Sequence, residues 1–270
     1  MNARVHGLCV WLAVAIFMLP IIWMFGTAFK SPGEILNAGA RLIPQHISVS
    51  SFIALWQGNL PTLVGNTLFI SLAATAISVV VAFFAAYALV RYRFPAKLDN
   101  LFLLTVLVIK MMPPIVIAIP LYTLMNHLGL LNTRFGLVLA YQVYTLPFCI
   151  WMLLGFVRDI PLEIEEAGAM DGAYLCKRLA YIVFPLCAPG LVATSIFAMI
   201  LGWNEFLFSL LFIYTPDKFT IPLFISNFMT EDGTAWGALM AIGIVSSLPM
   251  LALAGYMQRY LLRGFSMGLK

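Results

Sequence analysis

Long apolar runs alternate with short polar segments along the whole chain. Six of these runs reach the length of about 20 residues that an α-helix needs to cross roughly 30 Å of hydrocarbon. They cover residues 8–29, 63–90, 101–125, 135–157, 182–214 and 235–257. The first run is too long for the apolar part of a signal peptide and has no convincing small-x-small cleavage site, so we predict that it is retained. The pattern predicts an all-α, polytopic membrane protein with six transmembrane helices, and we expect residues 1–270 to form a single transmembrane domain.

The composition agrees with this interpretation, because 63% of the residues are hydrophobic and 10% are charged. An ordinary soluble domain has about 25% charged residues. The four cysteines form no C-x-x-C pair, and His6, His46 and His127 belong to no metal or catalytic-triad motif. We therefore expect a membrane protein that is not itself an enzyme, binds no metal or cofactor, and has no nucleic-acid partner.

The basic residues predict how the chain is oriented in the bilayer. Cytoplasmic segments of membrane proteins are enriched in Lys and Arg. If the N-terminus is inside, four basic residues are external: Lys30, Arg41, Arg134 and Lys218. Ten are then cytoplasmic: Arg4, Arg91, Arg93, Lys97, Arg158, Lys177, Arg178, Arg259, Arg263 and Lys270. This asymmetry places both termini in the cytoplasm and makes segments 31–62 and 215–234 external.

Small residues and prolines mark two of the runs. The second run has Ala74, Ser78, Ala82 and Ala86 at a strict four-residue spacing, which lets helix backbones approach closely in lipid. Packing inside the chain is the favoured interpretation, and an interface with a second membrane subunit is the alternative. In the third run, the proline-rich stretch "KMMPPIVIAIP" at 110–120 suggests a helix shaped around a cavity.

A charged segment at about 158–185 separates the fourth and fifth runs. Its stretch "RDIPLEIEEAGAMDGA" places Pro161 near the first turn of a helix, followed by three glutamates that complement the positive end of the helix dipole. Gly172 suits the left-handed residue that ends a helix, and a second short helix is expected from Ala173. Helices that rest on a bilayer surface favour basic residues on their polar face, and this one is acidic. We therefore favour a helix that docks into a partner protein over one that lies on the membrane.

This segment resembles the conserved cytoplasmic loop of ABC importer permeases, E-A-A-x3-G-x9-I-x-L-P. The chain has "EAGAMDG", then nine residues, then "IVFP". The matching positions are Glu166, Ala167, Gly172, Ile182 and Pro185. Gly168 replaces the second alanine, which keeps the position small and makes the helix less rigid, and Phe184 replaces leucine.

Four further stretches are similar to the carbohydrate-uptake branch of these permeases, to which the maltose-system permease belongs. They are "MMPPIVIAIPLYTLMNHLGLLNT", "LPFCIWML", "GWNEFLFSLL" and "QRYLLRGFSMG", in the expected order. The resemblance covers essentially the whole chain. It implies a permease subunit in the plasma (inner) membrane of a prokaryote, with a cytoplasmic coupling helix between transmembrane helices 4 and 5.

The resemblance also implies partners and a docking site. Members of the family pair with a second permease, which is usually a different chain in the carbohydrate branch. They take ATP-driven motion from two P-loop ATPase subunits and receive solute from an extracytoplasmic binding protein. The chain has no G-x4-G-K-[ST] motif, so ATP and Mg²⁺ are expected in the ATPase partners. The predicted ATPase-docking residues are Glu165, Glu166, Ala167, Gly168, Asp171, Gly172, Ile182 and Pro185.

Ionisable and polar residues inside the runs define a candidate translocation path. A charge near the bilayer centre costs about 2.5–3.5 kcal/mol, so it usually faces a cavity or a partner. Lys110 lies roughly 15 Å into the third run and is expected to pair with a carboxylate, contact carbonyls freed by the nearby prolines, or line the solute path. Trp203, Asn204 and Glu205 offer a ring face and hydrogen bonds to a polyhydroxylated solute; alternatively, Asn204 and Glu205 hold helices together.

The expected function is therefore import of a sugar, oligosaccharide or polyol by alternating access, with the external segment 215–234 as a candidate contact for the binding protein. One rival is a channel or secondary transporter that works without an ATPase. The other is an intramembrane enzyme that uses Lys110 and Glu205. Neither rival explains the order and spacing of the loop motif.

Overall fold

The computed structural model describes the backbone of residues 3–37, 41–230 and 233–267, and the side chains of residues 5–35, 41–228 and 235–256. Within these limits the regular structure is helical apart from one small hairpin. The helices are α1 (Ala3–Ala28), α2 (Pro32–Asn37), α3 (Ser50–Gln57), α4 (Leu60–Arg91), η1 (Pro95–Lys97), α5 (Leu98–Met111), α6 (Pro114–His127), α7 (Arg134–Arg158), α8 (Leu162–Met170), α9 (Leu175–Arg178), η2 (Leu179–Val183), α10 (Phe184–Trp203), α11 (Leu207–Phe212), η3 (Pro216–Lys218), α12 (Ile221–Ser226) and α13 (Trp236–Met267). The hairpin pairs β1 (Met229–Thr230) with β2 (Gly233–Thr234) in antiparallel register.

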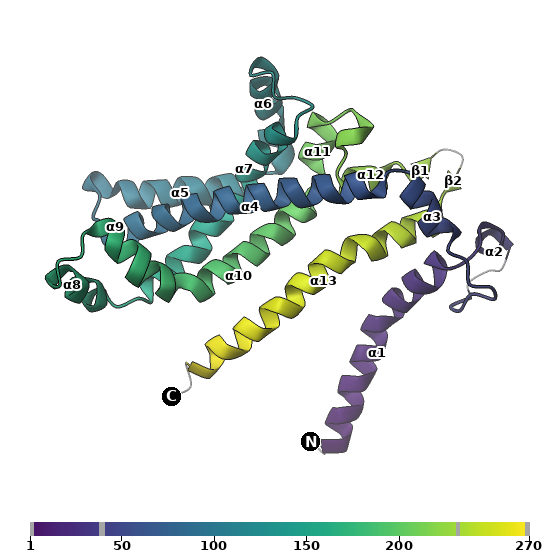
Figure 1. Ribbon diagram of the computed structural model, residues 1–270, viewed down its shortest axis with the longest axis horizontal. Coiled ribbons are helices and arrows are strands. Elements are labelled where there is room, and N and C mark those ends of the chain that lie inside the picture. The colour runs from purple at the N-terminus through teal and green to yellow at the C-terminus, as the bar shows by residue number, and fades with distance from the viewer. Residues whose placement is uncertain (1–2, 38–40, 231–232, 268–270) are drawn as a thin grey trace.

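The centre of the molecule is formed by α4, α7 and α10, which pack against one another, with α5 beside α7 (Figure 1). The small-residue stripe of α4 lies in this core, because Ala74, Ser78, Ala82 and Ala86 are fully buried within the chain. Ser78 also donates a hydrogen bond to Gln142 Oε1 of α7 at 2.7 Å. The stripe therefore serves packing inside the chain, as favoured from the sequence.

Helix α1 stands apart from this core over most of its length and packs mainly against α13 (Figure 1). Its apolar side chains are exposed, with Trp11 and Phe17 among the most exposed. Contacts with other helices are concentrated near its end, where Met24 and Ala28 join a cluster with α3, α10 and α13. A long apolar helix with so little cover inside the chain requires lipid or another subunit around it.

Among the described residues, five helices are long and apolar enough to cross a membrane, and a bent pair supplies a sixth candidate span. The run 101–125 is a bent pair of helices: α5 and α6 meet at an angle of 101°, and the break lies within the proline-rich stretch. Met112 and Pro113 are extended at the break, with ψ angles of 140° and 130°. A residue that precedes proline is pushed out of the helical region, and two consecutive prolines impose this twice.

The prediction of one helix over 182–214 was wrong. The fifth span covers Leu175–Trp203 and ends before a non-helical turn that leads into α11. The expected separate helix from Ala173 is instead continuous with this span through the π-helical turn η2. Pro185 lacks an N–H for the carbonyl one turn earlier, and a wider π turn directly before it accommodates that loss.

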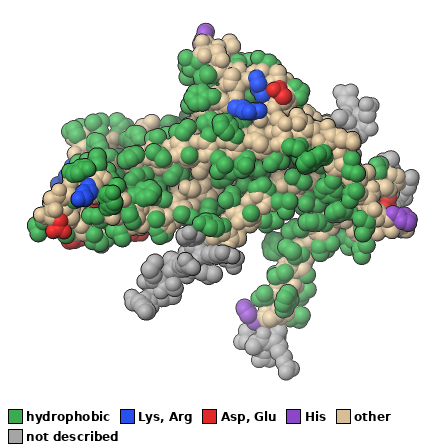
Figure 2. All heavy atoms as spheres, viewed as in Figure 1, with side chains coloured by type: hydrophobic (Ala, Val, Ile, Leu, Met, Phe, Trp, Pro, Cys, Tyr) green, Lys and Arg blue, Asp and Glu red, His purple; other side chains and the backbone are tan. Residues whose placement is uncertain are grey.

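Charged side chains gather at the α8 end of the molecule and beside α6 and α11, whereas the surface between them is largely hydrophobic (Figure 2). This division agrees with a chain whose middle lies in hydrocarbon. Some features of the sequence lie outside the residues whose side chains are described. They are the tail motif at 258–268 and four of the basic residues counted above, Arg4, Arg259, Arg263 and Lys270.

Candidate functional site

The predicted docking helix is α8, which lies at one end of the bundle beyond the C-terminal end of α4 (Figure 1). Pro161 precedes its first residue, and the carboxylates of Glu163 and Glu165 lie in the first turn, where they complement the helix dipole. At the other end, Gly172 adopts a φ of 80°, which confirms the predicted left-handed cap. The Gly172 N–H donates to Ala169 O and the Ala173 N–H donates to Gly168 O, both at 3.0 Å. This pair of hydrogen bonds is a Schellman motif, and it ends α8 sharply.

Glu165, which was placed among the docking residues, points into the protein and is 2% exposed. Its Oε1 accepts a hydrogen bond from Arg91 Nε at 2.7 Å, and its Oε2 accepts one from Tyr87 Oη at 2.8 Å. Arg91 Nη2 also donates to the Ile160 carbonyl at 2.7 Å. Glu165 therefore joins α8 to the end of α4, and its carboxylate does not lie on the exposed face of the helix.

Gly168 packs inward against Ile182. A Cβ atom at position 168 would lie 2.4 Å from Ile182 Cδ1 and 3.8 Å from Arg178 Cγ. An alanine at this position would require the Cδ1 end of the Ile182 side chain to move aside. Ile182 is half-buried behind α8, whereas Pro185 is exposed at the start of α10. Ile182 therefore packs behind α8 at Gly168.

The outward side of α8 combines acidic and apolar groups. Glu166, Ala167 and Asp171 are all exposed there, as predicted. Sequence reasoning gave little weight to Met170 and Tyr174, whose side chains are 89% and 70% exposed. Exposed Met170 at the end of α8 and exposed Tyr174 just before α9 are typical of a protein interface, and their position beside the acidic motif was the available signal.

Two of the four predicted path residues are buried within the chain. Trp203 is almost fully buried, and its Nε1 donates to Ser246 Oγ of α13 at 3.2 Å, so its ring face is covered. Glu205 is 8% exposed and caps α11, since its carboxylate accepts from the backbone N–H groups of Phe208 at 3.0 Å and Ser209 at 3.4 Å. Trp203 therefore joins α10 to α13, and the Glu205 carboxylate stabilises the first turn of α11.

The other two path residues are exposed. Lys110 lies in the last turn of α5, just before the break, with Nζ 5.5 Å from the centre of the Phe148 ring. Asn204 is exposed and donates its Nδ2 to the Ile200 carbonyl of its own helix at 2.8 Å. Lys110 and Glu205 form no ion pair with each other; within the described side chains, the one ion pair is Arg91–Glu165.

Comparison with known proteins identifies the group to which the chain belongs. The profile of the family described as binding-protein-dependent transport system inner membrane component matches residues 78–267, more than half of the chain. The chain belongs to this family. It is a transmembrane permease subunit of an ABC importer.

Named relatives resemble the permease over nearly its whole length. The diacetylchitobiose uptake system permease protein DasC of Streptomyces coelicolor is 34% identical over 260 residues, which are 95% of this chain and 94% of the relative. The trehalose transport system permease protein SugB of Mycobacterium tuberculosis is 33% identical over 262 residues, which are 95% of this chain and 93% of the relative.

A solved structure confirms the fold of the permease. The crystal structure of a bacterial ABC transporter involved in the import of the acidic polysaccharide alginate contains a chain with a TM-score of 0.80 and 22% identity. The match covers 95% of the permease and 96% of that chain. At this identity the likeness concerns the fold alone, including the bundle around α4, α7 and α10.

At the end of the permease opposite α8, Asn132 was missed by sequence reasoning although it lies in the quoted "HLGLLNT" stretch. It has a φ of 55°, and its Oδ1 accepts from the backbone N–H of Thr215 at 3.3 Å and from its hydroxyl at 2.9 Å. Lys218 Nζ donates to the Asn132 carbonyl at 2.9 Å. Asn132 therefore fixes the first part of the predicted external segment 215–234, of which residues 231–232 lie outside the described residues.

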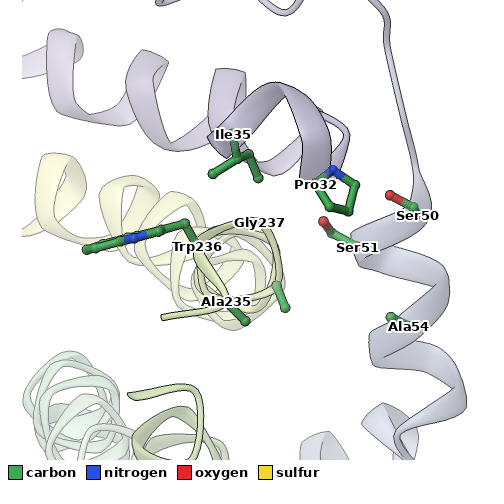
Figure 3. A pocket seen from close by; sticks show the side chains of 9 residues that line it. Pro32, Ile35, Ser50, Ser51, Ala54, Ala235, Trp236 and Gly237 are labelled. Carbon is green, nitrogen blue, oxygen red and sulfur yellow. The ribbon is translucent and has the colours of Figure 1, made fainter. Parts of the chain in front are cut away.

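The same end of the permease has a pocket of about 420 Å³ where α2, α3 and the start of α13 meet. Figure 3 shows Pro32 and Ile35 on one side of the start of α13 and Ser50 and Ser51 on another. A Cβ atom at Gly237 would lie 2.6 Å from Ser51 Oγ, so glycine is needed where α13 meets α3. The lining is mostly apolar and contains no charged side chain among the described residues.

Proposed function

We propose that this permease imports a sugar, oligosaccharide or related polyol by alternating access, driven by ATPase subunits that dock on α8. The relatives whose names mention diacetylchitobiose and trehalose, at 34% and 33% identity, support the choice of cargo. The observation that carries the mechanism is the structure of α8, with one side fixed to α4 by Glu165 and the opposite side exposed. In this proposal residues 1–270 form one transmembrane domain, and about 158–185 form its docking loop.

The exposed side of α8 fits a cleft with an apolar floor and a basic rim. Met170 and Tyr174 supply apolar contact area, and Glu166 and Asp171 supply charge for basic residues of the ATPase. Ala167 leaves the middle of this side nearly flat, which permits close approach. Apolar anchors surrounded by charged pairs are the usual arrangement of such interfaces. Gly172 defines the corner, Gly168 packs on Ile182 behind the helix, and Pro185 completes the proposed docking motif at the start of α10.

The remaining partners and the orientation belong to the same proposal. In this proposal a second permease, which is a different chain, covers α1 together with lipid. The exposed apolar side chains of α1 are the evidence for this partner. The excess of basic residues supports a cytoplasmic location for α8 and both termini. ATP and Mg²⁺ bind in two P-loop ATPase subunits, and an extracytoplasmic binding protein contacts segment 215–234. ATP binding closes the ATPase pair and turns the cavity between the permeases outward, and hydrolysis resets it.

The experiment is gentle extraction of the tagged permease from its native membrane, followed by mass spectrometry of all co-purifying chains and uptake assays in proteoliposomes. We expect a P-loop ATPase and a second permease to co-purify. We also expect ATP-dependent uptake of trehalose, diacetylchitobiose or a chemically similar saccharide. A permease that purifies alone and conducts these saccharides without ATP contradicts the proposal and favours a channel or secondary transporter.

A native cysteine tests the orientation. Cys176 is exposed beside α8, whereas Cys149 and Cys187 are buried. In a Cys9→Ser background, a membrane-impermeant maleimide should label Cys176 only after the cells are permeabilised. The matched control, Tyr214→Cys with Cys176→Ser, should be labelled in intact cells. The reverse pattern contradicts the orientation.

A further inference from the structure

The Arg91–Glu165 ion pair joins the docking helix to α4. Both carboxylate oxygens of Glu165 are bonded, and the side chain of Arg91 is 11% exposed. Arg91 also holds the Ile160 carbonyl just before α8 begins, so α8 is tied to α4 at two points of the chain. A buried pair of this kind fixes one geometry, because each group loses its hydration and has to keep its partner.

The opposite end of α4 is tied to the external segment. Asn66 is buried, and its Nδ2 donates to the carbonyls of Asp217 at 2.9 Å and Phe219 at 3.0 Å. Thr67 Oγ1 accepts from the Ile221 N–H at 2.9 Å. These side-chain hydrogen bonds connect α4 with residues 217–221, more than 150 positions later in the chain.

Helix α4 has the properties of a stiff rod between these two ends. Its 32 residues correspond to a length of about 48 Å. Among the described helices of 20 residues or more, α1, α7, α10 and α13 each have a proline inside, and α4 has one only at its start. Interior prolines are sites where helices kink, so α4 is the long helix least able to bend between its ends.

We propose that α4 couples the docking helix to the external segment as one rigid body, with Arg91 and Glu165 as the positioning residues that fix α8 to it. This inference rests on the proposed docking of an ATPase on α8. Movement of α8 on ATP binding is then transmitted along α4 to residues 217–221, where Asn66 and Thr67 hold the segment.

The test measures the distance between α8 and the external half of α4 during the ATP cycle. Spin labels are placed at Leu68→Cys and Glu163→Cys in a Cys9→Ser, Cys176→Ser background, and the complex with its co-purified ATPase is placed in lipid nanodiscs. Pulsed electron paramagnetic resonance then gives the distance distribution without nucleotide and with ATP, Mg²⁺ and vanadate. We expect one narrow distribution that is the same in both states.

Arg91→Glu should broaden or shift this distribution in the vanadate-trapped state, and the exchange Arg91→Glu with Glu165→Arg should narrow it again. Arg93→Glu is the matched control, because Arg93 is exposed two positions later and should leave the distribution unchanged. Arg91→Lys keeps the positive charge and loses the forked guanidinium group that donates to both Glu165 and Ile160. It should show intermediate broadening, and it replaces Arg91→Glu in the test if that variant does not fold.

The external end has its own variant and readout. Asn66→Leu should leave the label distance unchanged and lower the stimulation of ATP turnover by the external binding protein about tenfold, within the range of coupling between distant sites. A wild-type distance that changes with nucleotide overturns the rigid-body proposal, as does an Arg91→Glu distribution identical to that of the wild type. The docking proposal fails by a different result, namely that no ATPase co-purifies with the wild-type permease. Failure of the rigid-body proposal can therefore be distinguished from failure of the docking proposal.

Discussion

The permease has two buried glutamates at helix starts, and they perform different tasks. Glu165 lies in the first turn of α8 and pairs with Arg91 of another helix. Glu205 lies just before α11 and is satisfied by backbone N–H groups of that same helix. The first fixes the position of one helix relative to another, and the second stabilises one local turn. An acidic residue near a helix start therefore indicates long-range function only when its partner comes from elsewhere in the fold.

The largest effect is expected from removing the partner of Arg91. Glu165→Ala leaves a buried guanidinium without its carboxylate, which should cost about 3–5 kcal/mol of stability. Thermal unfolding of the purified permease measures this loss. Glu163→Ala is the matched control, because this exposed acid on the same turn should change stability by less than about 0.5 kcal/mol. Equal stability of the two variants contradicts the role of Glu165 in joining α8 to α4.

A smaller loss is expected from Gly168→Ala, because the new methyl group would meet Ile182 Cδ1. Overpacking against the movable end of a side chain lies at the lower end of the usual range of about 1–3 kcal/mol. Adding Ile182→Val removes the Cδ1 atom and should restore most of the stability. Gly155→Ala in α7 is the control, since a Cβ there meets nothing within 4 Å. If Gly168→Ala is as stable as Gly155→Ala, the contact between position 168 and Ile182 does not affect the free energy of unfolding.

Glu205→Ala removes the cap of α11 and should cost about 1–2 kcal/mol, within the range of capping side chains. Thermal unfolding again measures the loss, while saccharide uptake by the folded fraction should retain its apparent affinity. Asn204→Ala, the exposed neighbour, should be nearly neutral. If the Glu205→Ala permease has normal stability and an altered apparent affinity for the saccharide, Glu205 belongs to the translocation path.

The smallest effect is expected from Lys110→Met, which removes the contact with the Phe148 ring. Cation–π contacts are worth about 0.5–1 kcal/mol at exposed sites. Phe148→Leu and the double variant complete a mutant cycle, in which the coupling energy should fall in this range. A coupling energy near zero shows that Lys110 has another partner, and uptake assays of the same variants then test whether that partner is the solute.

Hydropathy was sufficient to find the spans that became α1, α4, α7 and α13, because an apolar run of the right length has few alternatives to a transmembrane helix. It did not locate the break within 101–125 or the end of the fifth span at Trp203, because it does not register a backbone break between apolar residues. Pro113 and Pro114 were a readable signal for the first break, whereas the turn after Trp203 depends on hydrogen bonds to Glu205 that are formed only in the folded chain.

The docking segment shows the same limit at the scale of one residue. Its motif, helix and glycine cap could be read from the sequence, since spacing and turn chemistry are local. The sequence did not separate Glu165 from its neighbour Glu166, because adjacent residues of a helix face different directions and the orientation is set by Arg91, 74 positions earlier. Local patterns therefore predicted the helix and its cap, and a distant ion pair decided which residues of the helix are exposed.

The measurement that tests this account most directly is quantitative recovery of the ATPase with the tagged permease carrying Glu166→Lys. This substitution reverses the charge on the exposed side of α8 and leaves the Arg91–Glu165 pair untouched. We expect ATPase recovery to fall at least about tenfold, equivalent to 1.4 kcal/mol, with unchanged membrane insertion and thermal stability. Recovery equal to that of the wild type would contradict the assignment of α8 as the docking helix.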